Sequence, residues 1–224
     1  MSIDENIRSV RKRIEGAAKR SGRSPDEITL VAVTKNHTVS EIQQVINSAV
    51  TNLGENRVQE LLPKREALGD VVAWHFIGHL QRNKVKYIIP LIYLIQSVDS
   101  IALAREINKQ CRELGKVQDV LLEVNVSGEA SKYGFSPEEV LFAVDELARF
   151  KNVQIKGLMM MAPFISDIGL LRLYFAKMKE LFDNLSKRQG PNFEMLSMGM
   201  TNDFEIAIEE GSNMVRVGTA IFTP

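Results

Sequence analysis

A lysine at the end of an apolar run is the residue of this chain best suited to covalent chemistry. The run from Ile28 to Lys35 is rich in β-branched side chains, and a polar turn follows it. Such a run predicts a buried strand, and parallel-strand proteins bind ligands at the carboxyl ends of their strands. A partly desolvated lysine with a lowered pKa is the nucleophile that attacks carbonyl compounds. The alternatives are that Lys35 snorkels to solvent or pairs with a carboxylate such as Glu55.

A second group of residues, near the carboxyl terminus, has the composition of a phosphate site. The segment 196–203 runs from a strand pattern into a helix pattern, and a second glycine and a hydroxyl follow the run 215–217. Glycine lets the backbone approach an anion, and free N–H groups at a helix amino terminus bind it. The candidate residues are Ser197, Gly199, Thr201, Gly218 and Thr219. The alternative is an ordinary helix cap at Thr201 or Asn202.

Arg216 precedes Gly218 by two residues, so the two positions share one face of a strand, which we expect to point inward. The alternative for Arg216 is a salt bridge with Glu123 or another core carboxylate. Asn56 and His79 also follow strand patterns. Each alone is weak evidence, because asparagine forms turns and a lone histidine is usually structural.

A carbonyl-reactive lysine together with a phosphate site suggests two classes of ligand. One is a sugar phosphate, as in a Schiff-base aldolase. The other is pyridoxal 5′-phosphate (PLP), an aldehyde that carries its own phosphate. These residues by themselves leave both classes open.

The elements that must position these residues repeat one sequence pattern, a short apolar run followed by a helical segment. The predicted strands are 28–35, 51–56, 74–78, 94–98, 120–126, 155–160, 195–198 and 214–218. The predicted helices are 3–20, 39–50, 57–68, 83–90, 101–114, 137–150, 170–187 and 204–210. Every strand but the last is followed by a helix. This alternation predicts an α/β fold, a closed (β/α)8 TIM barrel with an extra N-terminal helix.

An open, doubly wound sheet is the second possibility for the fold. It is weakened because no predicted strand is followed by a G-x-G-x-x-G or P-loop pattern. The chain has no Pro/Ser-rich linker or shift in composition, so we expect residues 1–224 to form a single domain.

The composition excludes several classes of function. The 28 basic and 28 acidic residues balance, which argues against a dedicated nucleic-acid binder. The single cysteine, Cys111, excludes an internal disulfide and a cysteine-cluster metal site, and we expect it to be packed in the core. No signal-peptide pattern or stretch of about 18 apolar residues occurs. We therefore expect a soluble, cytoplasmic protein without a membrane partner.

Motifs along nearly the whole chain resemble those of the pyridoxal-phosphate homeostasis proteins, single-domain relatives of the alanine racemase barrel. They are AVTK at 32–35, GENRVQE at 54–60, WHFIGHLQRNK at 74–84, SVD at 97–99, EVN at 123–125, KYGF at 132–135, GLM at 157–159, LSMGM at 196–200 and VRVGTAIF at 215–222. Together these motifs are highly specific.

The resemblance implies a role for each candidate residue. Lys35 would hold PLP covalently as an internal aldimine, and Arg216 would face the pyridine nitrogen and keep it unprotonated. Asn56 and His79 would line the same mouth. The residues expected to bind the phosphate are Ser197, Gly199, Thr201, Gly218 and Thr219.

The resemblance also implies a carrier and buffer of PLP that regulates vitamin B6 and amino-acid homeostasis and passes PLP to apo-enzymes, without strong catalysis. The alternative is an amino-acid racemase or another weak PLP enzyme. Racemases take an opposite-face tyrosine from a second β-domain that this sequence lacks, which argues against efficient racemisation and for a monomer. The chain departs from the family at Thr201, usually a serine, and at its end, Phe222 to Pro224.

Overall fold

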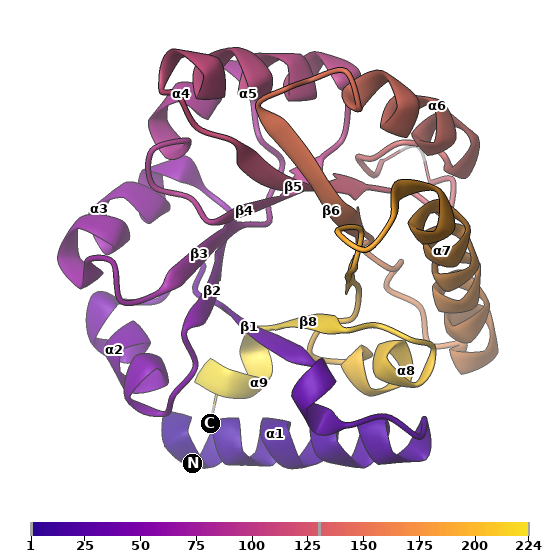
Figure 1. The fold of residues 1–224 in the computed structure, drawn as a ribbon. Helices are drawn as coiled ribbons and strands as arrows, with labels where there is room; N and C mark the ends of the chain where they lie inside the picture. The colour runs from indigo at the N-terminus through magenta and orange to yellow at the C-terminus, as the bar shows by residue number, and fades with distance from the viewer. Residues whose placement is uncertain (1, 130, 224) are drawn as a thin grey trace.

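The computed structural model of the chain describes residues 2–129 and 131–223 and forms a closed barrel of eight parallel strands. The strands follow one another around the barrel in chain order, and β8 closes on β1 through the pairs Leu30 with Val215 and Val31 with Arg216. Helices surround the strands in Figure 1. The predicted (β/α)8 barrel is therefore confirmed.

Each predicted strand and helix occurs, with ends within three residues of those expected from the sequence. The strands are β1 Thr29–Val33, β2 Asn52–Glu55, β3 Ala73–Phe76, β4 Leu94–Val98, β5 Gln118–Glu123, β6 Val153–Met159, β7 Met195–Ser197 and β8 Met214–Val217. The helices are α1 Ile3–Arg20, α2 Val39–Asn47, α3 Val58–Leu68, α4 Val85–Ile88, α5 Ile101–Glu113, α6 Pro137–Leu147, α7 Ile168–Gln189, α8 Phe204–Glu209 and α9 Thr219–Phe222. Short 3-10 turns occur at η1 Pro25–Glu27 and η2 Arg82–Lys84.

The prediction that the last strand has no helix after it is wrong, because α9 follows β8. This single turn is too short to be predicted from helix propensity. Its stability comes from tertiary contacts: Ile221 is fully buried, and the Asn6 side chain of α1 donates hydrogen bonds to the carbonyls of Ile221 at 2.9 Å and Thr223 at 3.0 Å.

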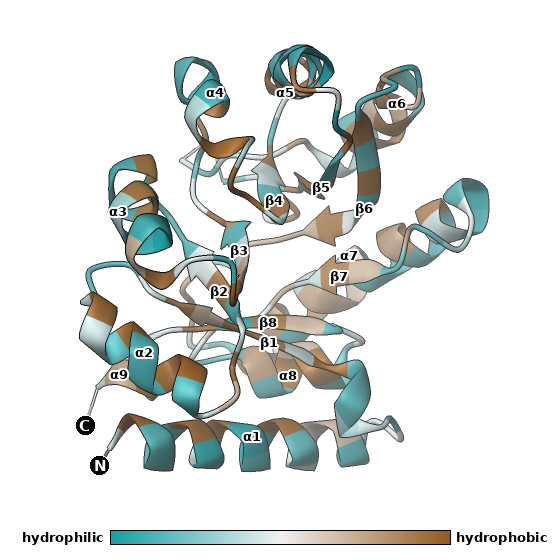
Figure 2. Cartoon of the chain, turned by 60° about the vertical axis from the view of Figure 1, so that its left-hand side comes forward, coloured by the Kyte–Doolittle hydropathy of each residue, from teal (hydrophilic) through white to brown (hydrophobic). Residues whose placement is uncertain are grey.

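The extra N-terminal helix α1 packs along the outside of the barrel. Ser2 and Glu5 form a capping box, and the buried residues Ile7, Val10 and Ile14 recur at helical spacing. Figure 2 shows the apolar side of α1 turned toward the barrel and its polar side turned outward. Burying each of these side chains contributes roughly 1.5–3 kcal/mol, which explains why the helix stays docked.

The core has two parts, one between the strands and the helices and one inside the barrel. The inner part is small and consists of Val31, Leu94, Leu121, Met159 and Met214. The predicted packing of Cys111 is confirmed: its side chain is fully buried, and burial raises the pKa of its thiol to about 11. Within residues 2–129 and 131–223, no helix has both the length and the apolar character needed to cross a membrane.

Candidate functional site

A cavity of about 570 Å³ opens at the carboxyl ends of the strands. Loops after β1, β2, β3, β6, β7 and β8 line it. Six of the nine predicted site residues are in its wall, namely Lys35, Asn56, Thr201, Arg216, Gly218 and Thr219. A larger groove of about 770 Å³ lies at the other end of the strands, beside α1, and its lining contains none of the nine. Because barrels hold their ligands at the carboxyl ends of the strands, the smaller cavity is the candidate site.

Lys35 lies in the turn after β1. The strand ends at Val33, and Thr34 extends the pairing by donating its N–H to the Gly54 carbonyl at 2.9 Å. Asn36 then adopts a positive φ of 66°, a conformation that asparagine tolerates better than most residues, and the chain turns into α2. These constraints place Lys35 in the cavity wall.

Lys35 is more exposed than the sequence analysis predicts. Its side chain is exposed rather than partly buried, and it forms no salt bridge within the described part of the chain. The alternative pairing with Glu55 is wrong, because Glu55 is fully buried and binds Lys64 of α3 instead, at 2.7 Å. The amine of Lys35 is therefore accessible to a ligand.

Arg216 lies beneath the cavity, inside the barrel, and is 3% exposed. Its Nη2 donates to the Met160 carbonyl at 2.8 Å and its Nη1 to the Ser197 hydroxyl at 2.6 Å. Burial lowers the pKa of the guanidinium to about 10, against the opposing charges of Glu123 and Asp203, so it remains a cation at neutral pH. The alternative of a salt bridge to Glu123 is wrong, since no such pair forms among the described residues.

A chain of buried hydrogen bonds continues from Ser197 into the barrel. The Ser197 hydroxyl donates to Gln96 Oε1 at 2.7 Å, and Gln96 Nε2 donates to His75 Nδ1 at 2.9 Å. With Nδ1 accepting, the Nε2–H of His75 donates to Asn52 Oδ1 at 3.0 Å. Burial lowers the pKa of His75 to about 3, so its ring is neutral. The chain fixes the direction of each bond, and the Ser197 hydroxyl points at Gln96.

The predicted phosphate residues fall into two groups. Thr201, Gly218 and Thr219 line the cavity, and the Thr201 hydroxyl accepts the Ala220 N–H at 3.4 Å. Ser197 and Gly199 are buried outside the lining. The structure therefore brings three of the five to the cavity surface and places two behind it.

Asp203, which the sequence reading did not single out, joins this wall of the cavity. Its carboxylate accepts the Met200 N–H, and burial raises its pKa. The contact closes the loop between β7 and α8. The helix-cap alternative for this loop placed the cap at Thr201 or Asn202, whereas the cap position of α8 is Asp203.

Asn56 lines the cavity, whereas His79 does not. Asn56 Oδ1 is buried and has no hydrogen-bond partner among the described residues, so the site holds an acceptor that a ligand donor can satisfy. The His79 ring pairs with Asp99 at 2.8 Å and stacks on Tyr133 with ring centroids 3.8 Å apart. These contacts fix the His79 ring, which lies outside the cavity lining.

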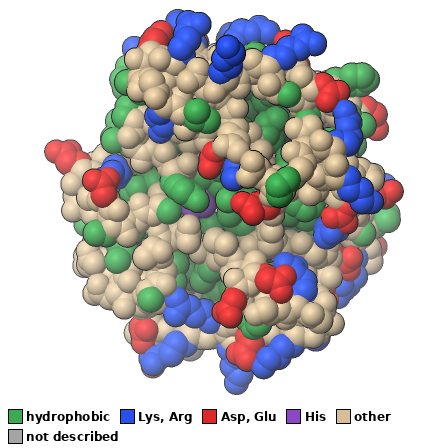
Figure 3. All heavy atoms as spheres, in the orientation of Figure 1, with side chains coloured by type: hydrophobic (Ala, Val, Ile, Leu, Met, Phe, Trp, Pro, Cys, Tyr) green, Lys and Arg blue, Asp and Glu red, His purple; other side chains and the backbone are tan. Residues whose placement is uncertain are grey.

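Other parts of the cavity wall come from residues that were not among the nine predicted ones. The His37 ring stacks on Phe222 with centroids 3.7 Å apart, and its Nδ1 lies 3.3 Å from Glu41. The loop after β6 contributes residues 161–164, of which Phe164 is 96% exposed. On the face drawn in Figure 3, acidic and basic side chains are interspersed with hydrophobic ones.

Glu123, at the end of β5, is the second titratable group near Arg216. It is 6% exposed, and burial together with the charge of Asp99 raises its pKa to about 7, while Arg216 opposes that shift. The carboxyl group therefore changes charge near neutral pH. The sequence indicated Glu123 only as a possible partner of Arg216 and carried no sign of this titration.

Lys64 and Gln96 are two further residues of the site region that were not predicted from the sequence. Lys64 is 7% exposed and occupies the buried face of α3 with Val58, Leu61 and Leu68. A charged residue among apolar ones at helical spacing was a usable signal for a buried contact. Gln96 carried a weaker signal, a polar side chain inside an otherwise apolar strand.

Comparisons with known proteins agree with this architecture. The family model of the alanine racemase N-terminal domain matches residues 2–224. A pyridoxal phosphate homeostasis protein of Aquifex aeolicus is 42% identical over 223 residues, which cover 99% of this chain and 98% of that protein.

Two solved structures are similar over nearly their whole length. One, of an unknown protein from Bifidobacterium adolescentis, is 35% identical with a TM-score of 0.94 and covers 98% of this chain and 94% of that one. The other is PipY of Synechococcus elongatus with PLP bound, 31% identical with a TM-score of 0.86, covering 99% of this chain and 100% of that one. The chain therefore belongs to the alanine racemase N-terminal domain family and, within it, to the pyridoxal phosphate homeostasis proteins.

Proposed function

We propose that this chain binds PLP covalently through Lys35 and acts as a carrier and buffer of PLP in vitamin B6 and amino-acid homeostasis. The observation that carries the proposal is one cavity that holds both the accessible amine of Lys35 and the hydroxyls of Thr201 and Thr219. The relatives named pyridoxal phosphate homeostasis proteins and the PLP-bound structure of PipY support it.

The cavity fits this ligand in size and in polarity. Its volume of about 570 Å³ lies within the range of about 300–1,000 Å³ that is usual for small-molecule sites. Asn56 Oδ1, which has no partner in the described part of the chain, offers an acceptor, and Arg216 supplies a fixed cation at the floor. When bound, PLP would supply an aldehyde that a primary amine attacks, forming a C=N bond with loss of one water molecule.

The protein's own residues would divide the work as follows. Lys35 provides the amine. Thr201, Gly218 and Thr219 provide hydroxyl and backbone donors for the phosphate, and Arg216 disfavours a proton on the pyridine nitrogen because it is itself a nearby cation. Ser197 and Gly199 support that wall from behind, Asn56 lines the mouth, and His79 lies outside the cavity lining.

We infer that catalysis is weak or absent. Two-base chemistry on an amino acid needs an acid or base on each face of the substrate. The specific observation that favours the alternative, a weak racemase, is Glu123, whose pKa of about 7 suits proton transfer. Glu123 does not line the cavity, which favours the carrier. Lys35-dependent exchange of the α-proton of amino acids into deuterium oxide would favour the enzyme.

We further infer a monomer in the cytoplasm that hands PLP to PLP-dependent apo-enzymes. Sedimentation of the purified chain measures its oligomeric state, and mixing the loaded chain with an apo-enzyme measures transfer.

Borohydride trapping tests the covalent proposal. Protein incubated with PLP and reduced should carry the ligand's mass on the peptide that contains Lys35. The Lys35→Ala variant should lose both the yellow colour and this mass, and Lys86→Ala, at an exposed lysine of α4, should keep them. Modification of another lysine in place of Lys35 would overturn the proposal. Colourless protein trapped only with a sugar phosphate would instead indicate a Schiff-base lyase.

A further inference from the structure

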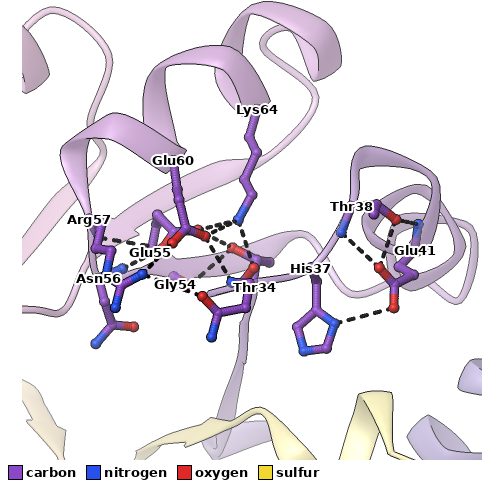
Figure 4. A network of polar contacts seen from close by, with 11 residues as sticks. Thr34, His37, Thr38, Glu41, Gly54, Glu55, Asn56, Arg57, Glu60 and Lys64 are labelled. Atoms are coloured by element: carbon purple, nitrogen blue, oxygen red, sulfur yellow. Dashed lines mark hydrogen bonds and ion pairs between the residues drawn. The ribbon is translucent and has the colours of Figure 1, made fainter.

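The turn that carries Lys35 rests on a buried lysine of α3, Lys64. Its Nζ donates to the Thr34 carbonyl at 2.7 Å, to Glu55 Oε2 at 2.7 Å and to Glu60 Oε2 at 3.0 Å. Figure 4 shows these contacts converging on the ammonium group. They use all three donors of the ammonium.

The same contacts reach both chain neighbours of Lys35. Thr34 is held at its carbonyl by Lys64 and at its hydroxyl by Glu55 Oε2, at 3.0 Å. Asn36 donates its N–H to Glu60 Oε2 at 2.8 Å, the oxygen that Lys64 also binds. Because the backbone is fixed immediately before and after Lys35, the direction in which its side chain leaves the turn is fixed too.

The network also reaches a second wall of the cavity. Glu55 Oε1 accepts the N–H of Asn56 at 2.7 Å and that of Arg57 at 3.4 Å. One carboxylate therefore joins the turn of Lys35 to the backbone of Asn56, and both residues line the cavity. Lys64 itself is absent from the lining.

A buried ion pair is a costly way to stabilise a fold. Taking both charges from water costs several kcal/mol, and packed apolar residues often stabilise the same space as well or better. The side chains of Lys64 and Glu55 are 8% and 0% exposed, so both charges of this pair are removed from water. What apolar residues cannot provide is a hydrogen bond to a chosen backbone carbonyl. That points to the placement of the turn as the contribution of the pair.

We propose that Lys64 is a positioning residue that holds Lys35 in the geometry for attack on the aldehyde. The proposal rests on the proposed function of Lys35 and assigns Lys64 no contact with the ligand. A misplacement of about 1 Å at a reacting group can slow a reaction about a hundredfold. The clamp at Thr34 and Asn36 prevents that misplacement.

Two ligands that differ at one group provide the test. PLP carries the aldehyde that reacts with Lys35, whereas pyridoxamine 5′-phosphate carries an amine there and binds without reaction. The double variant Lys64→Met, Glu55→Gln leaves no buried unpaired charge and keeps both side chains close to their original size. The rate of borohydride-trapped modification of Lys35 should fall about tenfold to a hundredfold. Affinity for pyridoxamine 5′-phosphate should be unchanged.

Arg23→Met is the matched control. Arg23 also pairs with a carboxylate, Glu27, and donates to two carbonyls, those of Ser212 at 2.8 Å and Ile208 at 3.3 Å, but it lies at the other end of the barrel. This variant should trap PLP at the normal rate. The proposal is overturned if the double variant traps PLP at the normal rate. It is also overturned if the affinity for pyridoxamine 5′-phosphate falls by the same factor as the rate of trapping, which would indicate a collapsed cavity. A wild type that traps no PLP at Lys35 would instead remove the proposed function itself.

Discussion

Arg216 donates a hydrogen bond of 2.6 Å to the hydroxyl of Ser197, so the two residues expected at opposite ends of one ligand are in direct contact. The Ser197 hydroxyl has its own proton engaged with Gln96 at 2.7 Å. Its oxygen and its proton are therefore both in use before any ligand arrives. The contact makes the orientation of the Arg216 guanidinium depend on a side chain behind the cavity.

Replacing Ser197 by alanine should therefore act through Arg216. The change leaves Nη1 of a buried guanidinium without its acceptor, and we expect a loss of about 1–3 kcal/mol in the free energy of unfolding. The absorbance spectrum of bound PLP should also shift, because we expect the Arg216 cation to face its ring and the substitution releases it. Denaturant titration and spectroscopy measure the two effects.

Ser212→Ala is the control for this prediction. Ser212 is fully buried, and its hydroxyl lies within hydrogen-bond distance of three carbonyl oxygens, of which that of Met198 is the closest at 2.8 Å. It forms no hydrogen bond with Arg216 among the described residues. It should lose stability and keep the spectrum. If Ser197→Ala lost affinity for PLP but not for pyridoxal, which lacks the phosphate, its hydroxyl would be a phosphate ligand.

Replacing Thr201 by valine should weaken binding of the phosphate selectively. The substitution keeps the shape of the side chain and removes a hydroxyl from the cavity wall. A hydrogen bond to a charged group contributes about 1.5–3 kcal/mol, so affinity for PLP should fall roughly 10–100-fold while affinity for pyridoxal changes little. Thr223→Val removes another hydroxyl from the same cavity and should leave the ratio of the two affinities unaltered. Equal losses for both ligands would exclude Thr201 as a phosphate donor.

Replacing Glu123 by glutamine should change how stability depends on pH. The pKa of Glu123 is raised from 4.5 to about 7 in the folded chain, so between these values the folded state holds a proton that the unfolded state has lost. The wild type therefore loses stability as pH rises from 4.5 through 7. Removing this titration should raise the stability of the variant relative to the wild type by about 3 kcal/mol across that window.

The comparison with wild type at each pH isolates this effect. The pKa of His75 is lowered from 6.5 to about 3, so its contribution is present above 6.5 and is lost as pH falls. That slope is opposite to the slope of Glu123, and it occurs in both proteins and cancels. Denaturant titrations at several pH values measure the difference, and parallel stability curves would contradict the raised pKa.

The fold was predictable because eight repeats of one pattern leave few alternatives. An apolar run followed by a helical pattern needs a parallel sheet with right-handed crossovers, and eight such units close into a barrel. The turn α9 was missed because its stability comes from contacts with α1, more than 200 residues away in the chain, such as the bond between Asn6 and Ile221.

The candidate site was predictable only in part. Lys35 and Thr201 follow strands, and strand ends meet at one rim, so residue type and position indicated them. The hydrogen bond between Lys64 and Thr34 joins positions 30 residues apart and depends on how α3 packs, which periodicity does not specify. The direction of the Ser197 hydroxyl is likewise set by Gln96, 101 residues away in the chain.

Gly199 gives the last prediction, because its backbone has a φ of +97° that only glycine adopts readily. A Cβ at this position would lie 2.6 Å from Ala207 Cβ and 2.9 Å from Phe204 Cα, so the loop after β7 would be pushed away from α8. Gly199→Ala should therefore lose both stability and affinity for PLP, since Thr201 follows in the same loop.

Gly22→Ala separates backbone strain from crowding. Gly22 has a φ of +70°, and no atom of residues 2–129 and 131–223 lies within 4 Å of a Cβ built there. This substitution should therefore cost only the left-handed conformation, roughly 1–2 kcal/mol. Gly199→Ala should cost this and a further 1–3 kcal/mol, roughly, for overpacking. Thermal denaturation and PLP titration of both variants measure the difference. Equal stability losses, with PLP affinity intact in Gly199→Ala, would show that close contact with α8 does not hold the cavity wall in place.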